Sequence, residues 1–122
     1  MDVVGNGSEL ASKYEAIERY ARNIEGMIIE HLAAHFPRLP DSGETDGIEL
    51  KFGKRYAKLI RVTTSRTGSS RSVYGFVDID TGDILKPAGW KAPAKHARGN
   101  INDASGGMDC SGPWGIAHMS EL

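Results

Sequence analysis

Apolar residues in the first third of the chain recur at the spacing of one helical face. The series comprises positions four or three residues apart: Leu10, Tyr14, Ile17, Ala21, Ile24, Ile28, Leu32 and Phe36. This spacing forms one stripe along an α-helix. Ser8 is a suitable N-cap, and Pro37 disfavours helical geometry at the residue before it. The pattern therefore predicts a helix over residues 8–36.

The apolar stripe of this helix has two possible partners. A surface helix usually buries such a stripe against its own sheet, and we favour that interpretation. The spacing is also close to a heptad repeat, so the stripe from Leu10 to Phe36 could instead form the seam of a homodimer.

Alternating apolar and polar residues follow a turn-rich linker at residues 40–47. Four segments have strand character, at residues 48–52, 56–64, 73–79 and 84–85. Short connections rich in Gly, Ser and Asp join them, which is typical of hairpins. We expect an α+β fold in which the long N-terminal helix packs on an antiparallel meander of three to four strands.

Regular patterning fades in the last part of the chain, residues 87–122. Pro93 and Gly99 suit the two ends of a single helical turn at residues 94–98. The rest is rich in glycine and is expected to be an irregular tail, although Trp114 and Met119 argue against full disorder. We interpret the chain as a single domain, 1–122, with a helix at 8–36, a sheet at 48–86 and a basic box with a Gly-rich tail at 87–122.

Charge is distributed unevenly along these segments. The 122 residues carry a net charge of only −1. Residues 1–47 hold nine acids against four bases, whereas residues 48–100 hold four acids against eleven bases. Residues 101–122 hold three acids and no base. A basic block between two acidic ones creates a local field that attracts anions despite the neutral total.

The end of this basic block combines cations with an aromatic and an amide side chain. The residues concerned are Trp90, Lys91, Lys95, His96, Arg98 and Asn100. On a helical turn, Lys91, Lys95 and Arg98 would lie on one side, beside a helix N-terminus that suits a phosphate. Trp90 could stack on a base. The alternative is a solvated loop in which Trp90 plugs the core.

The predicted strands supply a second basic set. Its members are Lys51, Lys54, Arg55, Lys58, Arg61, Arg66 and Arg71. Lys58 alternates with Tyr56, and Tyr74 alternates with Phe76, so each pair is expected to share a face of the sheet. Aromatic and cationic side chains on an open sheet are typical of single-stranded nucleic-acid platforms. Tyr74 and Phe76 could equally lie in the core under the helix. From both sets, the predicted binding residues are Trp90, Lys91, Lys95, His96, Arg98, Asn100, Lys54, Arg55 and Lys58.

Other chemistry has little support in the sequence. His31 and His35 are four residues apart, but their segment lacks the His-Glu-x-x-His order of zinc proteases. Cys110 is the single cysteine, and no spacing pairs it with His96 or His118 as a catalytic centre. Phosphate-binding glycine motifs are absent. We expect no enzymatic activity, no cofactor and no metal. No apolar run reaches membrane-spanning length, and a secretory signal is lacking, so a cytoplasmic location is expected.

Three stretches in the second half of the chain form a distinctive set of motifs. They are the hairpin at residues 73–86, Trp90-Lys91-Ala92-Pro93-Ala94-Lys95 with Ala97-Arg98-Gly99-Asn100-Ile101, and Gly112-Pro113-Trp114-Gly115. In these motifs the chain resembles a family of small tailed-bacteriophage proteins. The resemblance covers roughly residues 50–119 and implies a phage or prophage origin with action in the host cytoplasm. It implies no reaction.

These observations lead to one favoured function and several alternatives. We expect a binding protein for DNA, RNA or another phosphate-bearing ligand. Sequestration of a small nucleotide is one alternative. Another is a protein-directed effector that inhibits a host or defence enzyme, with the acids Glu15, Glu18 and Glu25 docking on a basic partner. An enzyme that acts on a bound nucleotide is a weaker possibility.

Overall fold

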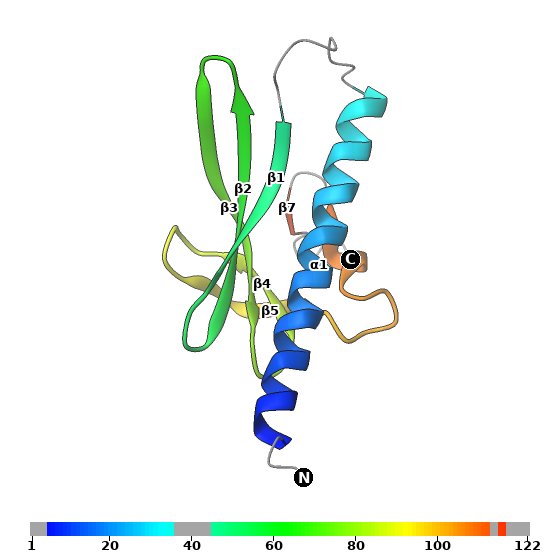
Figure 1. Ribbon diagram of the computed structural model, residues 1–122, viewed down its shortest axis with the longest axis vertical. Helices are drawn as coiled ribbons and strands as arrows, with labels where there is room; N and C mark the ends of the chain where they lie inside the picture. The colour runs from blue at the N-terminus through cyan, green and yellow to red at the C-terminus, as the bar shows by residue number, and fades with distance from the viewer. Residues whose placement is uncertain (1–4, 36–44, 113–114, 117–122) are drawn as a thin grey trace.

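A long helix crosses one face of a five-stranded antiparallel sheet. The computed structural model describes residues 5–35, 45–112 and 115–116. Helix α1 spans Gly5–His35. The sheet contains β1 (Thr45–Phe52), β2 (Tyr56–Ser65), β3 (Gly68–Asp78), β4 (Asp83–Pro87) and β5 (Pro93–Asn100). Its strand order β1-β2-β3-β4-β5 follows the chain, as a meander does (Figure 1). The predicted α+β class is confirmed, but the sheet has five strands, not three or four.

The apolar stripe of α1 packs on this sheet. Ile17, Ala21 and Ile24 are fully buried in a core that also contains Leu59 and Val77 from the central strands. Burial of one such side chain stabilises a fold by about 1.5–3 kcal/mol. The favoured partner of the helix is therefore confirmed along the middle of the stripe. The side chain of Leu10 and all of Phe36 lie outside the described part, and the homodimer stays a prediction.

Residues 93–100 form an edge strand, so the predicted helical turn at 94–98 is wrong. Leu85 pairs with Ala97 and Ile84 with Gly99 across β4 and β5. The turn between these strands is closed by a hydrogen bond from the Ala88 amide to the Ala92 carbonyl. Pro93 and Gly99 are weak local signals, whereas pairing with β4 gives backbone groups on one side of the segment hydrogen-bond partners. Tertiary pairing therefore overrides the local preference.

The segment after β5 is also more regular than predicted. It contains a short 3₁₀ helix, η1 (Met108–Cys110), and the two-residue strands β6 (Ser111–Gly112) and β7 (Gly115–Ile116). The Tyr20 and Ser111 hydroxyls lie 2.7 Å apart, and the Tyr74 hydroxyl donates to the Gly112 carbonyl. Cys110 and Ile116 are buried in the main core. Residues 101–107 form turns, as the predicted irregular tail requires, whereas the short elements after them are regular and complete the core. Trp114 and Met119 lie outside the described residues.

A β-bulge in β3 changes which side chains of this strand point to each face of the sheet. The register shifts where Leu59 opposes Gly75 and Ile60 opposes Val73, which leaves Tyr74 as the extra residue. Such a bulge reorients the side chains that follow it. Tyr74 therefore joins the core under α1, whereas Phe76 is buried outside that core cluster, on the outer face. The expectation that these two aromatics share a face is wrong.

The start of the sheet also differs slightly from the prediction. Strand β1 begins at Thr45, so the last part of the predicted 40–47 linker belongs to the sheet. The beginning of that linker lies outside the described residues. Leu50 is partly buried against the core, while Lys51 between Leu50 and Phe52 is exposed. This alternation turns Lys51 towards the outer face, away from α1.

Candidate functional site

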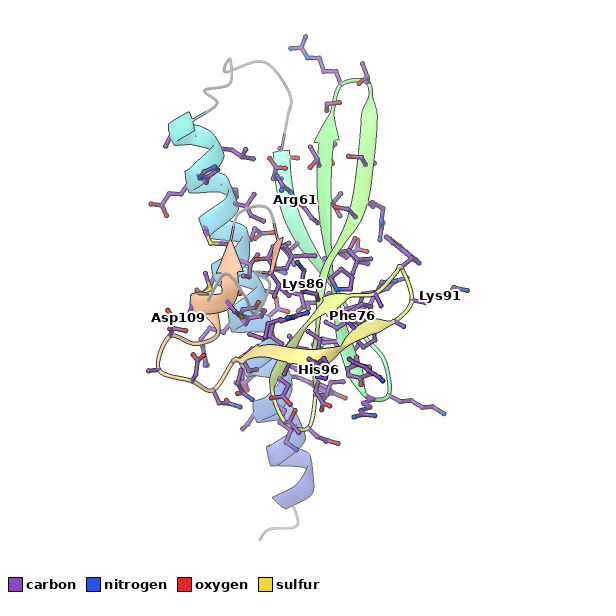
Figure 2. The ribbon with its side chains drawn as sticks, turned by 180° about the vertical axis from the view of Figure 1, so that it is seen from behind. Arg61, Phe76, Lys86, Lys91, His96 and Asp109 are labelled. Atoms are coloured by element: carbon purple, nitrogen blue, oxygen red, sulfur yellow. The ribbon has the colours of Figure 1, made fainter. Side chains whose placement is uncertain are left out.

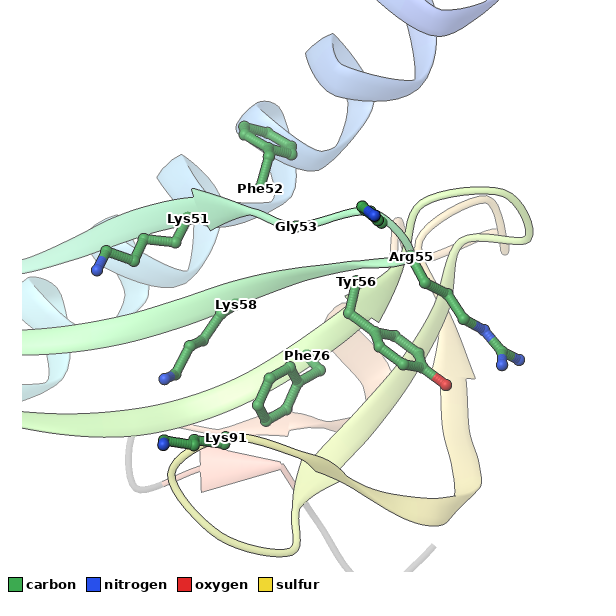
Figure 3. A pocket seen from close by; sticks show the side chains of 9 residues that line it. Lys51, Phe52, Gly53, Arg55, Tyr56, Lys58, Phe76 and Lys91 are labelled. Atoms are coloured by element: carbon green, nitrogen blue, oxygen red, sulfur yellow. The ribbon is translucent and has the colours of Figure 1, made fainter.

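The outer face of the sheet carries a hollow of about 360 Å³. Figure 3 shows side chains from β1, β2 and β3 around it, together with Lys91 from the loop between β4 and β5. We call it the outer hollow. Its lining residues are Lys51, Phe52, Gly53, Lys54, Arg55, Tyr56, Lys58, Phe76 and Lys91.

Strand register explains why these residues meet. Lys51 lies opposite Lys58, and Lys58 lies opposite Phe76, so the three form one row across the sheet. Neighbouring strands are about 4.8 Å apart, which brings the side chains within contact range. Tyr56 precedes Lys58 by two residues and therefore points to the same face. The row therefore forms only when the three strands pair in this register.

Aromatic rings form the floor and one flank of the site. Tyr56 and Phe76 pack edge to face, with ring centroids 6.3 Å apart. The Arg55 guanidinium lies 5.0 Å from the Tyr56 ring centroid. Beside the hollow, the Lys58 ammonium lies 4.0 Å from the Trp90 ring centroid, a cation–π distance. Trp90 is 48% exposed, so it does not plug the core.

Every charged side chain among the described residues that line the outer hollow is positive. Lys51, Lys54, Arg55, Lys58 and Lys91 line it, and none of the described lining residues is acidic. Partial removal from water, followed by repulsion from Lys51, Lys91 and Arg71, lowers the pKa of Lys58 below its ordinary 10.5. Adjacent like charges are unfavourable in a sheet. The arrangement therefore raises the free energy of the unliganded face and favours an anion there.

Acids near this surface have partners of their own. Arg71 forms an ion pair with Glu49. Asp78 accepts hydrogen bonds from the amides of Asp80 and Thr81, and its carboxylate lies 3.4 Å from the Arg55 Nε. Arg55 remains largely exposed despite that contact, so it is available to a second anion. The turn explains the grouping of Asp78 with Asp80, because an aspartate side chain there accepts hydrogen bonds from the turn amides.

Strand β5 separates the other predicted binding residues from the hollow. The helical spacing that would align Lys91, Lys95 and Arg98 does not exist in a strand, which has a period of two. Lys95 and His96 are exposed on β5 and do not line the hollow. Figure 2 shows Lys91 in the loop and His96 on the strand.

Asn100 serves the structure of this edge, and Arg98 is half-buried beside it. The buried Nε of Arg98 has no hydrogen-bond partner among the described residues. The Asn100 amide nitrogen donates to the Thr81 carbonyl and to the Asp83 carboxylate. The Asn100 side-chain oxygen accepts from the Asn102 amide. Asn100 therefore ties β5 to the turn before β4.

Of the nine predicted binding residues, the structure brings five together around the outer hollow. These are Trp90, Lys91, Lys58, Lys54 and Arg55. The prediction lacked the other lining residues, which are Lys51, Phe52, Gly53, Tyr56 and Phe76. Alternation in β1 and β2 was a usable signal for Lys51 and Tyr56. No local signal could place Phe76, because the bulge before it determines its face.

The structure gives no alternative centre for metal or thiol chemistry in its described part. No group of three or more His, Cys, Asp or Glu residues there could hold a metal ion. Cys110 is buried, and this burial raises the pKa of its thiol. A buried thiol of raised pKa is a poor nucleophile. His118 and the His35 side chain lie outside the described part. No helix in the described part is long and apolar enough to cross a membrane.

Fold and site together define a small α+β protein that packs a helix on one sheet face and presents a cationic hollow on the other. The chain belongs to a family of unknown function, DUF7717, whose profile matches residues 8–114. No curated protein and no solved structure matches the chain.

Proposed function

We propose that this protein binds nucleic acid, or another ligand that carries several phosphates, on the outer face of its sheet. One observation carries the proposal: five cations from two strands, the turn between them and the β4–β5 loop converge on one hollow whose described lining includes no acid. The lysines of this set would contact phosphates, and Trp90 and Tyr56 would contact bases.

The energetics of the free protein support a bound anion. Lys51 and Lys58 face each other on paired strands, and Lys91 adds a further positive charge. Folding brings these like charges together, which lowers the stability of the free protein. A surface with only a structural role would not need this arrangement. A bound phosphate makes these charges favourable, because each lysine then lies next to an opposite charge. Neutralised phosphates also release the counterions of the nucleic acid.

The acidic helix offers less support for a protein-directed effector. Two of the three acids considered for docking are already engaged, because both Glu18 and Glu25 pair with Arg22. Glu25 also accepts a hydrogen bond from the Ile48 amide, which gives it a structural role. Inhibition of a host or defence enzyme therefore ranks behind binding of a phosphate-bearing ligand.

The test is binding of fluorescent DNA and RNA oligonucleotides, followed by anisotropy at two salt concentrations. We expect Lys58→Glu and Lys91→Glu to weaken binding by at least tenfold. Arg19→Glu is the matched control, because Arg19 is exposed on α1 at the other side of the sheet. Absence of binding by the unaltered protein at low salt would refute the proposal. Equal loss from Arg19→Glu would show that only total charge matters.

We further propose that the protein is encoded by a phage or prophage and acts in the host cytoplasm. The support is the box that starts at Trp90 together with the glycine-rich segment around Gly112. Mapping the gene among those of a tailed phage or an integrated prophage would support this origin. A chromosomal setting without phage genes would contradict it.

A further inference from the structure

The outer hollow has an apolar floor between charged rims. This geometry favours ligands that combine an apolar group with negative charge over ligands that carry charge alone. Phe76 is only 3% exposed and forms the floor with Tyr56. Lys54 belongs to the β1–β2 turn. Arg55 lies on the same turn, and Lys91 lies on the loop between β4 and β5 (Figure 3). A simple phosphate site needs the rims but has no use for the aromatic floor.

We infer that the ligand is a single-stranded nucleic acid, and that one unpaired base enters the outer hollow while its neighbouring phosphates lie on the charged rims. This inference rests on the proposed function and names its substrate class. The hollow of about 360 Å³ lies at the small end of ligand pockets, which span about 300–1,000 Å³. One base fits that scale, and the partly exposed Tyr56 ring suits its flat apolar surface, with the buried Phe76 ring packed against Tyr56.

Duplex nucleic acid does not fit the same surface. A duplex keeps its bases stacked inside and presents phosphates outside, so the apolar floor would stay unused unless a base were flipped out. Flipping requires unpairing and unstacking, whereas a single strand offers bases with exposed faces. The aromatic floor therefore favours a single strand over a duplex of equal charge.

Trp90 supplies an optical probe at the rim. Its ring contacts the Lys58 ammonium, and Lys58 itself lines the hollow. A phosphate that pairs with Lys58 changes the charge next to the indole, so Trp90 emission is expected to change on binding. The second tryptophan, Trp114, is removed by Trp114→Phe so that the signal comes from one site.

The experiment compares six ligands on the full chain. They are a short single-stranded DNA, the same sequence as RNA, the matching duplex, a single strand with abasic positions, a free mononucleotide, and inorganic polyphosphate. We expect the single strands to bind at least tenfold more tightly than the duplex, the abasic strand and polyphosphate. DNA and RNA are compared only to identify the sugar, and tight binding of either one supports the inference.

Tyr56→Ala tests the floor, with Ile29→Ala as its control. Ile29 is an exposed apolar residue on α1 that does not line the hollow. We expect Tyr56→Ala to weaken single-strand binding about tenfold while polyphosphate binding stays unchanged, and Ile29→Ala to change neither. Thermal melting confirms that both variants fold. Phe76→Leu provides a second floor variant that keeps an apolar side chain.

The possible results separate this inference from the proposed function. If polyphosphate or the duplex binds as tightly as the single strand, the inference is wrong and the proposed function stands. The same conclusion follows if the abasic strand binds equally well. Binding of a free mononucleotide as tight as that of the oligonucleotide would replace the strand with a nucleotide ligand. If no ligand binds the unaltered protein, both proposals are wrong.

Discussion

At the scale of single residues, Lys58 shows most clearly how a group that is unfavourable in the free protein can favour ligand binding. It contacts Trp90, lines the outer hollow and faces other cations at short range. Its lowered pKa reflects partial desolvation first and repulsion second. The same two factors that disfavour its charge in the free protein make an incoming phosphate more favourable.

The lowered pKa predicts the pH dependence of binding. Because the pKa of Lys58 lies below the ordinary lysine value of 10.5, the side chain loses its charge at a lower pH than a fully solvated lysine does. Affinity for a phosphate-bearing ligand is therefore expected to fall as pH rises through that lowered pKa. Lys58→Arg keeps the charge over this range and should move the loss to higher pH. Anisotropy titrations across alkaline pH measure the effect, and identical profiles would contradict it.

Gly75 is a residue at which the fold leaves no room for a side chain. A Cβ at this position would lie 2.2 Å from the Ile116 Cδ1 and 3.0 Å from the Leu85 carbonyl oxygen. Gly75 faces the core directly after the bulged Tyr74, so β7 can pack closely against β3. The close approach links the end of the chain to the centre of the sheet.

We predict that Gly75→Ala lowers the free energy of unfolding by about 1–3 kcal/mol, as overpacking of a core does. Urea unfolding measures the change. Gly26→Ala is the control, because a Cβ there meets no atom within 4 Å and Ala favours the helix. A Gly75→Ala variant as stable as the unaltered protein would show that the Ile116 segment moves away without loss.

At the scale of elements, α1 does more than cover the core. It also closes the free edge of β1. The Arg22 guanidinium donates to the Ile48 carbonyl, and the Ile48 amide donates to the Glu25 carboxylate, both at 2.8 Å. Both backbone groups belong to the edge strand of the sheet. Exposed edges invite pairing with other chains, and this clamp satisfies the edge at its centre.

We predict that Glu25→Ala destabilises the protein by about 1–3 kcal/mol, because it leaves the Ile48 amide without its partner. Glu18→Ala is the matched control. Glu18 also pairs with Arg22, but that pair is exposed and its loss is expected to change stability by less than about 1 kcal/mol. Urea unfolding compares the two variants, and size-exclusion chromatography detects self-association through β1. Equal effects of both substitutions would contradict a role for the clamp.

At the scale of the whole molecule, the two faces of the sheet differ: one packs in the core, and the other carries the candidate binding surface. Its inner face packs on α1 and on the segment from η1 to β7. Its outer face holds the aromatic and cationic groups, over which the loop between β4 and β5 places Lys91 (Figures 2 and 3). Changes in the binding surface are therefore expected to affect ligand affinity more than folding.

This difference between the two faces predicts a specific salt dependence. The double variant Lys58→Gln with Lys91→Gln removes two expected phosphate contacts, so the slope of log affinity against log salt should become shallower by about 1.4 for a single strand. The control replaces Arg19 and Arg66 by Gln. Arg66 follows the last residue of β2, about 26 Å from Lys58 at 3.3 Å per residue. Equal slopes for the two double variants would contradict a localised site.

The helix, the meander and the basic character of the middle of the chain follow from the sequence alone. Periods of four and three or of two are local, so they determine α1 and the β1–β3 strands without knowledge of what packs against them. Alternation also turns Lys58 and Tyr56 to one face. These elements account for the fold class and for most of the cations at the site.

Only the tertiary structure decided where the remaining residues lie. Strand β5 exists because β4 offers partners for its backbone, and its residues carry no period that predicts this. The bulge opposite Ile60 separates Tyr74 from Phe76 and thereby creates the floor of the outer hollow. Both depend on pairing between distant segments, whose energy is non-local. The sequence therefore determines which groups are available for binding, and strand pairing determines which of them meet.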